Sequence, residues 1–214
     1  MFETKRKGVF RENFCNRIFL FSFIFLLTLT SIQCTKIKTD PQEFPEMKFN
    51  VDENLLGKEI TNHEFGFTFK APVSWKETKE IELQDITNKL TKVLSGKKNF
   101  SVKPLYIFVR NDGCVLNVAE LSLQQVSNDF DDNIKLYEDI FLANHDSLNI
   151  KKAKYSKNGL RIAQYLLQDN RIDFRLLFQD KKKNLIQFDY ISERKNYLNE
   201  IKAIESSIGS INLL

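Results

Sequence analysis

Long runs of alternating apolar and polar residues fill the last third of the chain, and this pattern limits the fold more than any other feature. In 172–179 every second residue is apolar, and 186–190 repeats the pattern. Asn158-Gly159, Asp169-Asn170 and 180–183 supply the residue types that turns prefer. A period of two indicates half-buried strands, so the sequence predicts an antiparallel β-meander with one buried face and one largely wet face.

Two more strand regions precede the meander. Phenylalanines alternate with small or polar residues over 65–69, which predicts a strand that Pro72 ends. Two apolar runs flank Asn111-Asp112-Gly113, and Asp-Gly between β-rich runs is a strong hairpin signal. A hairpin is therefore predicted around residues 111–113.

Three helices are predicted from apolar residues that recur at intervals of three and four. The first covers 83–94, the second starts near Ser127 or Asn128, and the last covers 197–208. The order strand, helix, hairpin, helix, meander, helix predicts an α+β domain with an antiparallel sheet packed by helices. We place this single globular domain at 59–214.

A basic segment and an apolar run open the chain. The run Ile18–Gln33 holds no charged residue, and five of the seven charged residues before it are basic. Sixteen helical residues span about 24 Å, which is short of the ~30 Å hydrocarbon core of a membrane. This order is typical of a secretory signal peptide, so we expect residues 1–33 to be an export signal.

Cys34 stands where the apolar run ends, and this arrangement resembles a bacterial lipoprotein signal. Ser31, Ile32 and Gln33 resemble the relaxed lipoboxes of spirochaetal lipoproteins. The resemblance implies acylation of Cys34 and a lipid-anchored protein of the cell envelope, in the outer membrane. An uncleaved membrane anchor and ordinary cleavage are the alternatives. After the lipidated cysteine, the polar segment 34–58 with its two prolines is expected to be a flexible tether.

Charge and cysteine content narrow the possible partners. The chain holds 32 basic and 28 acidic residues; 27 and 26 remain without 1–33, so the mature chain is nearly neutral and nothing favours nucleic-acid binding. Cys15 lies in the signal and Cys34 is the lipid site, which leaves Cys114 alone. We interpret Cys114 as a small buried strand residue rather than a reactive thiol.

The stretch Gly66–Trp75 (GFTFKAPVSW), followed by the meander and the closing helix, resembles the PsbP-like fold. That family includes the photosystem II extrinsic protein and a Ran-binding nuclear import factor. The resemblance covers roughly 61–214 and implies an α/β/α sandwich with a binding or assembly role and no catalysis. We interpret Trp75 as a core residue at the end of its strand.

The sequence contains no recognisable catalytic or metal-binding motif. His63 and His145 have no neighbouring ligand residues at metal spacing, and the glycine motifs of phosphate loops and nucleophile elbows are missing. A nucleophile–base pair of Cys114 and His145 can be drawn, but nothing in the local sequence favours it. We therefore predict neither an enzyme nor a cofactor.

The densest acidic cluster consists of Asn128, Asp129, Asp131, Asp132 and Asn133. Such oxygens suit calcium, but the turn glycine and the distal glutamate of an EF-hand loop are missing. We interpret the cluster as the acidic first turn of a helix, where the helix dipole favours negative charge.

Lysines gather at two ends of the predicted meander. Antiparallel hairpins can bring alternate turns to one side of a sheet, so these lysines form a possible interaction surface for anionic headgroups or polysaccharide. The alternative is that they keep turns soluble and sheet edges unpaired. The residues are Lys151, Lys152, Lys154, Lys157, Lys181, Lys182 and Lys183.

Together these patterns predict a membrane-tethered envelope lipoprotein whose domain binds an envelope protein or a polysaccharide without catalysis. A surface-displayed adhesin and an envelope enzyme with dispersed catalytic residues are the alternatives. A deep pocket with convergent polar groups and shifted pKa values would favour the enzyme, whereas an exposed apolar patch would favour protein binding.

Overall fold

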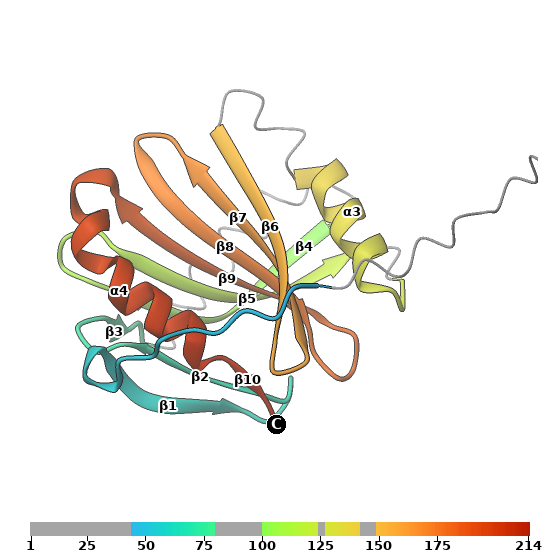
Figure 1. Ribbon diagram of the computed structural model, residues 1–214, viewed down its shortest axis with the longest axis horizontal. Coiled ribbons are helices and arrows are strands. Elements are labelled where there is room, and N and C mark those ends of the chain that lie inside the picture. The colour runs from blue at the N-terminus through green and yellow to red at the C-terminus, as the bar shows by residue number, and fades with distance from the viewer. Residues whose placement is uncertain (1–43, 80–99, 124–126, 142–148) are drawn as a thin grey trace, which may run out of the picture. The chain divides into compact units, whose positions relative to one another are not determined.

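The predicted hairpin and meander join in one large antiparallel sheet (Figure 1). A computed structural model describes residues 44–79, 100–123, 127–141 and 149–214. The strand order of the large sheet is β3-β4-β5-β9-β8-β7-β6. The strands are β3 (Lys76–Glu77), β4 (Phe100–Val109), β5 (Val115–Leu123), β6 (Asn149–Lys157), β7 (Leu160–Gln168), β8 (Arg171–Gln179) and β9 (Leu185–Glu193).

The turns of this sheet lie where turn residues were predicted. Asn158 and Gly159 both have positive φ angles, 49° and 77°, as a two-residue hairpin turn of right-handed twist requires. Gly113 has φ of 87° in the turn between β4 and β5. The predicted hairpin and the meander are therefore both confirmed.

A second, smaller sheet has the order β1-β2-β10. It consists of β1 (Leu56–Asn62), β2 (Phe67–Pro72) and β10 (Asn212–Leu213), and a short 3₁₀ turn, η1 (Glu53–Leu55), precedes β1. The strand predicted over 65–69 corresponds to β2. The sequence analysis missed β1 and β10. Both pair with β2, although β1 lies early in the described chain and β10 lies at its C-terminal end.

Two helices pack on opposite faces of the large sheet: α3 (Phe130–Phe141) and α4 (Arg194–Ser210). Both were predicted, whereas the helix predicted over 83–94 lies outside the described residues. Ile204 and Ile208 of α4 join one core cluster, and Phe130 and Ile134 of α3 join the other. The α+β class, with antiparallel sheets packed by helices, is confirmed.

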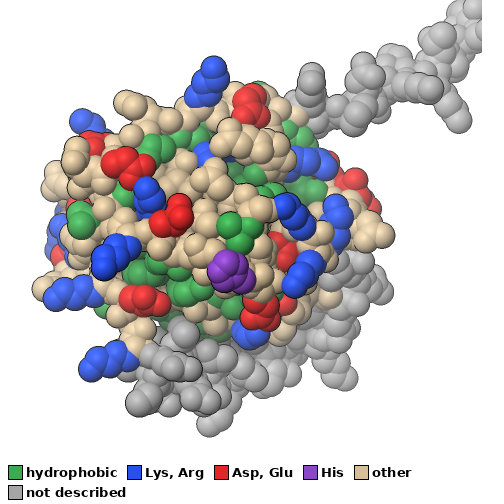
Figure 2. Space-filling model, turned by 90° about the horizontal axis from the view of Figure 1, so that it is seen from below, with side chains coloured by type: hydrophobic (Ala, Val, Ile, Leu, Met, Phe, Trp, Pro, Cys, Tyr) green, Lys and Arg blue, Asp and Glu red, His purple; other side chains and the backbone are tan. Residues whose placement is uncertain are grey.

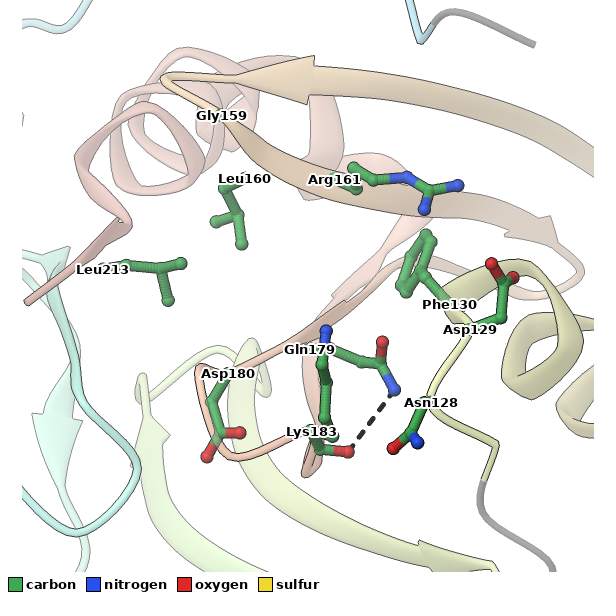
Figure 3. A pocket seen from close by; sticks show the side chains of 10 residues that line it. All are labelled: Asn128, Asp129, Phe130, Gly159, Leu160, Arg161, Gln179, Asp180, Lys183 and Leu213. Carbon is green, nitrogen blue, oxygen red and sulfur yellow. Dashed lines mark hydrogen bonds between the residues drawn. The ribbon is translucent and has the colours of Figure 1, made fainter. Parts of the chain in front are cut away.

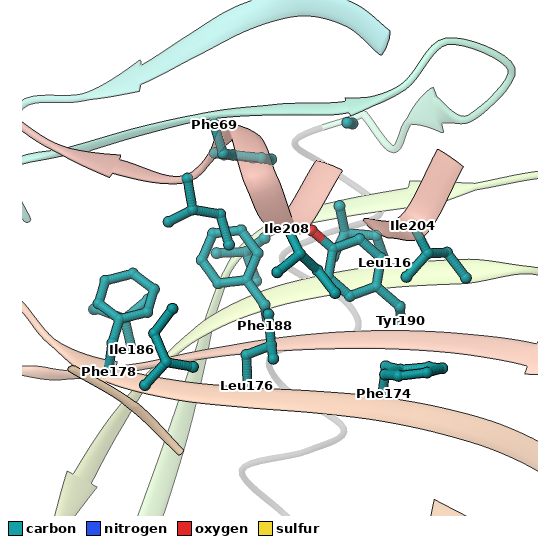
Figure 4. Close-up of a cluster of buried hydrophobic side chains, with 14 of the residues drawn as sticks. Phe69, Leu116, Phe174, Leu176, Phe178, Ile186, Phe188, Tyr190, Ile204 and Ile208 are labelled. Carbon is teal, nitrogen blue, oxygen red and sulfur yellow. The ribbon is translucent and has the colours of Figure 1, made fainter. Parts of the chain in front are cut away.

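The core beneath α4 is dominated by aromatic rings (Figure 4). The even-numbered residues of β8 and β9 supply most of the sheet side of this core, and their alternation in the sequence predicted a buried face. Phe67 and Phe69 reach it from the small sheet and are fully buried. The Phe188 ring lies 5.1 Å from Phe69 and 5.8 Å from Phe67, centroid to centroid, in edge-on arrangements that aromatic pairs prefer.

The opposite face of the meander is not wet, and this prediction was wrong. The second core cluster fills it, with Tyr165, Leu177 and Leu185 of the sheet packed near Tyr137 of α3. Arg175 belongs to the polar face that was predicted to be largely wet, yet only 9% of its side chain is exposed. Helix α3 covers this face, so the polar residues on it must find partners inside the protein.

The globular unit starts at Phe44, earlier than the predicted boundary at residue 59. Residues 44–52, called here the N-terminal segment, run past the outer edge of β6 before β1, and Glu46 forms a bridge with Ser156 there. Phe49 packs against the α4 core and Phe44 against the α3 core. The backbone N–H of Asp52 donates to Ser206 Oγ of α4 at 3.1 Å. The predicted tether therefore extends no further than residue 43.

Candidate functional site

A hollow of about 410 Å³ lies where the start of α3 meets two turns of the meander and β10 (Figure 3). The two turns are β6–β7 and β8–β9, which share one end of the sheet because Ile162 pairs with Phe178. The hollow is lined by residues from four separate parts of the chain: Asn128, Asp129, Phe130, Gly159, Leu160, Arg161, Gln179, Asp180, Lys183 and Leu213.

The acidic cluster forms the start of α3, as the sequence analysis proposed. Asp129 Oδ1 accepts the backbone N–H of Asp131 at 2.7 Å and of Asp132 at 3.3 Å, which makes Asp129 the cap of the helix. Asn133 is buried and closes the turn, because its amide both donates to the Ser127 carbonyl and accepts the Ser127 N–H. No group of three or more His, Cys, Asp or Glu suited to a metal ion exists among the described residues.

Asp180 shapes the opposite wall of the hollow. The residue is 3% exposed, and its carboxylate accepts the backbone N–H groups of Lys182 and Asn184, both at 2.8 Å. The Asn184 side chain adds a third hydrogen bond at 2.7 Å. This bonding fixes the β8–β9 turn, in which Lys183 takes a positive φ of 72° and joins the lining of the hollow.

Arg161 is held between two aromatic rings beside the hollow. Its guanidinium carbon lies 4.3 Å from the ring centroid of Phe44 and 5.2 Å from that of Phe130. Arg161 also pairs with Asp131, which accepts a second bond from Lys154 Nζ at 2.5 Å. Burial alone would raise the pKa of Asp131, but the hydrogen bonds and charges of Lys154 and Arg161 bring it below its ordinary value.

Several polar groups of the hollow are available to a ligand. Within the described residues, the Lys183 ammonium and the Asn128 amide have no hydrogen-bond partner, and Gln179 Nε2 makes only a long 3.4 Å contact with the Lys183 carbonyl. Leu160 and Leu213 provide an apolar wall (Figure 3). The hollow thus combines spare donors, spare acceptors and an apolar surface.

The predicted lysines do not form one patch. Lys152 lies 3.1 Å from Glu138 of α3, and Lys154 contacts Asp131, while Lys151 is exposed without a partner among the described residues. Lys157 is buried, which lowers its pKa, and Lys157 Nζ donates to the Ile211 carbonyl at 2.6 Å. The predicted lysines thus form two separate groups, one on strand β6 and one in the β8–β9 turn.

In the β8–β9 turn, Lys182 donates to the Glu64 carbonyl at 2.8 Å. Lys181 is exposed beside it, and Lys183 joins the hollow. Figure 2 views the molecule from the side of these turns and shows basic and acidic side chains interspersed.

The remaining predicted residues are placed as follows. Cys34 and His145 lie outside the described residues, and His63 is exposed in the β1–β2 loop. Cys114 is fully buried one residue before β5, and burial raises the pKa of its thiol. Trp75 is a core residue, as interpreted, and its indole N–H donates to Glu200 at 3.3 Å.

A buried ionic cluster beneath α3 was not predicted. Arg175 donates to Asp189 at 2.6 Å, to Asp173 at 2.9 Å and to the Tyr137 hydroxyl at 2.9 Å. Burial, with the nearby Asp189 charge, raises the pKa of Asp173 to about 7. Because Arg175 and Asp189 are directly paired across β8 and β9, a register read from the intervening turn could have revealed this cluster.

Comparison with known proteins gives likenesses among solved structures but none at the level of sequence families. No family model matches the sequence, and no curated protein matches it. The fold is similar to the solution structure of cyanobacterial PsbP (CyanoP) from Synechocystis sp. PCC 6803, at 13% identity and a TM-score of 0.43 over 73% of this chain and 92% of that chain. The α+β class stands on the observed strands and helices.

Proposed function

We propose that the protein is a lipid-anchored module of the cell envelope that binds a sugar unit of an envelope polysaccharide in the hollow, without catalysis. The hollow is the observation that carries this proposal. Its volume lies within the range of about 300–1,000 Å³ that is usual for ligand sites, at about 410 Å³.

The chemistry of the lining fits a hydroxyl-rich ligand. A hydroxyl both donates and accepts, so neighbouring hydroxyls could meet the Lys183 ammonium and the Gln179 amide oxygen together. The C–H face of a sugar ring is apolar and could lie on Leu160 and Leu213. A purely anionic ligand fits less well, because Asp129 lies on the same surface.

The two carboxylates of the hollow have structural roles, which supports binding rather than catalysis. Asp129 caps α3, and Asp180 holds the β8–β9 turn through three N–H groups. A general acid or base needs a carboxyl group that is free to exchange its proton with a substrate. Using either residue in this way would disturb the backbone that it holds.

The proposed anchor places the hollow near a membrane. Cys34 precedes Phe44 by ten residues, which reach at most about 35 Å when fully extended. Phe44 stacks on Arg161 at the rim of the hollow. Lipidation at Cys34 would therefore hold the hollow within reach of polysaccharide at that membrane surface. No helix among the described residues is long and apolar enough to cross a membrane, and Ile18–Gln33 lies outside them.

Sugar binding is tested by titrating the full-length protein in detergent micelles with N-acetylglucosamine, galactose and glucuronic acid. We expect amide chemical shifts to change at 128–130, 159–161 and 179–183. Gln179→Leu should weaken binding about fivefold, since it removes one hydrogen-bonding side chain. Gln168→Leu, at the opposite end of the sheet, should leave it unchanged. The absence of shifts for every sugar, or equal effects of both variants, would contradict the proposal.

The anchor is tested separately with Cys34→Ala. The variant should lose detergent-phase partitioning while the domain stays folded, because a lipid anchor depends on the acylated cysteine. The intact mass of the wild-type protein extracted from its membrane should correspond to Cys34–Leu214 plus acyl chains. A variant that stays bound to the membrane would refute the lipid anchor.

A further inference from the structure

Strand β6 forms one margin of the large sheet, and the described residues leave most of its outer edge unpaired (Figure 1). This strand has nine residues, whereas β3 at the opposite margin has only two. An open edge of this length presents a row of backbone donors and acceptors that can pair with another extended chain.

The N-terminal segment already pairs with the last part of this edge. Ser156 donates to the Pro45 carbonyl at 3.0 Å and accepts the Met47 N–H at 2.8 Å, in a parallel bridge centred on Glu46. The edge is therefore competent to add a strand.

Proline chemistry ends this internal pairing. In a parallel ladder the next acceptor on the edge, the Lys154 carbonyl, would receive the N–H of residue 45. Pro45 has no N–H to donate. The chain's own segment therefore cannot form the hydrogen bond to the Lys154 carbonyl in this register.

The remaining edge residues are Ile150, Lys152 and Lys154. The backbone N–H and C=O groups of successive strand residues point to alternate sides. Those of Ile150, Lys152 and Lys154 therefore point the same way as those of Ser156, away from β7. Within the described part of the chain, no hydrogen bond reaches these outward backbone groups. Three residues of edge are thus available to a partner.

Charge on the edge selects between possible partners. A second copy pairing edge to edge would bring the lysines around residue 152 close to the same lysines of the other copy, and opposed like charges are destabilising. Lys151 has no partner among the described residues, and the Lys152 and Lys154 side chains remain 51% and 42% exposed despite their ion pairs. Carboxylates are the complementary groups.

We propose that an extended, carboxylate-bearing segment of another protein adds as a strand to the outer edge of β6 along Ile150–Lys154. Backbone hydrogen bonds would supply most of the affinity, and the lysines would select against neutral and basic segments. This site is separate from the hollow, so it stands or falls independently of sugar binding.

Three labelled seven-residue peptides test the proposal against the full-length protein in detergent micelles. They alternate valine with glutamate, glutamine or lysine. We expect the glutamate peptide to bind at least tenfold more tightly than the glutamine peptide, and the lysine peptide not to bind. Binding should also slow hydrogen exchange of the Lys152 and Lys154 amides. Equal binding of the glutamate and glutamine peptides would overturn the charge selection, and absence of binding would overturn the whole proposal.

Proline substitution separates strand addition from simple charge attraction. Lys152→Pro removes an outward N–H without removing a β6–β7 hydrogen bond, whereas Lys152→Thr removes the same charge and keeps the N–H. The proline variant should bind the glutamate peptide at least tenfold more weakly than the threonine variant. The pair Lys154→Pro and Lys154→Thr repeats the comparison if Lys152→Pro unfolds. Equal affinities within each pair would rule out strand addition.

Discussion

The two faces of the large sheet are both buried, but by different means. The face beneath α4 is packed with aromatic rings, whereas the face beneath α3 combines apolar residues with the charges of Asp173, Arg175 and Asp189. The same strands supply both faces, because successive side chains point in opposite directions. Polar residues at every second position therefore do not show that a sheet face meets water. They show that each polar group needs a partner, from water or from the protein.

The aromatic face should give the largest loss on truncation. Phe188 is fully buried, and its ring packs against Phe67, Phe69 and Phe178. Phe188→Ala should lower the free energy of unfolding by about 3–5 kcal/mol, because it removes apolar contacts and leaves a cavity. Urea denaturation would measure the change. Phe188→Leu is the control and should cost less, and equal losses for both variants would argue against close packing here.

The ionic face should lose somewhat less when its cation is removed. Arg175→Met leaves Asp173 and Asp189 buried without their shared partner, and removing one member of a buried ion pair is strongly destabilising. We expect a loss of about 3 kcal/mol in urea denaturation, limited because Asp173 can take up a proton. Arg161→Met is the matched control and should lose under about 1 kcal/mol, since Arg161 is 40% exposed. Equal losses would show that burial adds nothing to the Arg175 interaction.

The sequence correctly predicted that the aromatic face is buried, but it wrongly predicted that the ionic face meets water. The reason is physical. Phe174 and Phe178 belong to a period of two that identifies a core face without knowledge of what covers it. The same pattern placed Arg175 in solvent. Its burial depends on α3, which the chain brings over this face from outside the meander and which supplies Tyr137. Local patterns do not report such a long-range cover.

The hollow was only partly predictable for a similar reason. The acidic start of α3 and the lysine turn at 181–183 were both noticed, but nothing in the sequence placed Asn128 near Lys183. Their proximity follows from the packing of α3 across the sheet. Strands β1 and β10 escaped prediction because β1 exposes much of its length and β10 has only two residues. Neither has a clear periodic pattern.

A pH dependence specific to the ionic face is the next expected effect. Burial and the charge of Asp189 raise the pKa of Asp173 to about 7, against about 3.9 in an unfolded chain. The folded state therefore binds more protons between these values, so the contribution of Asp173 to stability falls as pH rises from 4 to 7. Between pH 5 and pH 8, the free energy of unfolding of the protein should fall by about 2–3 kcal/mol relative to Asp173→Asn. Parallel curves for the two proteins would contradict a raised pKa.

The smallest effect concerns how the N-terminal segment closes the aromatic face. A Cβ atom at Gly209 of α4 would lie 2.6 Å from Val51 Cγ2 and 2.7 Å from Phe49 Cβ. Alanine is favoured over glycine inside helices by about 1 kcal/mol, but overpacking of this kind costs about 1–3 kcal/mol. Gly209→Ala should therefore lower the free energy of unfolding by about 1 kcal/mol overall.

Adding Val51→Ala removes the Cγ2 atom that makes one of the two close contacts, so a double-mutant cycle should show a favourable coupling between residues 51 and 209. If Gly209→Ala instead stabilised the protein, helix propensity would outweigh packing at this position. The N-terminal segment would then be a loose cover, and the two faces of the sheet would differ in how firmly they are closed as well as in their chemistry.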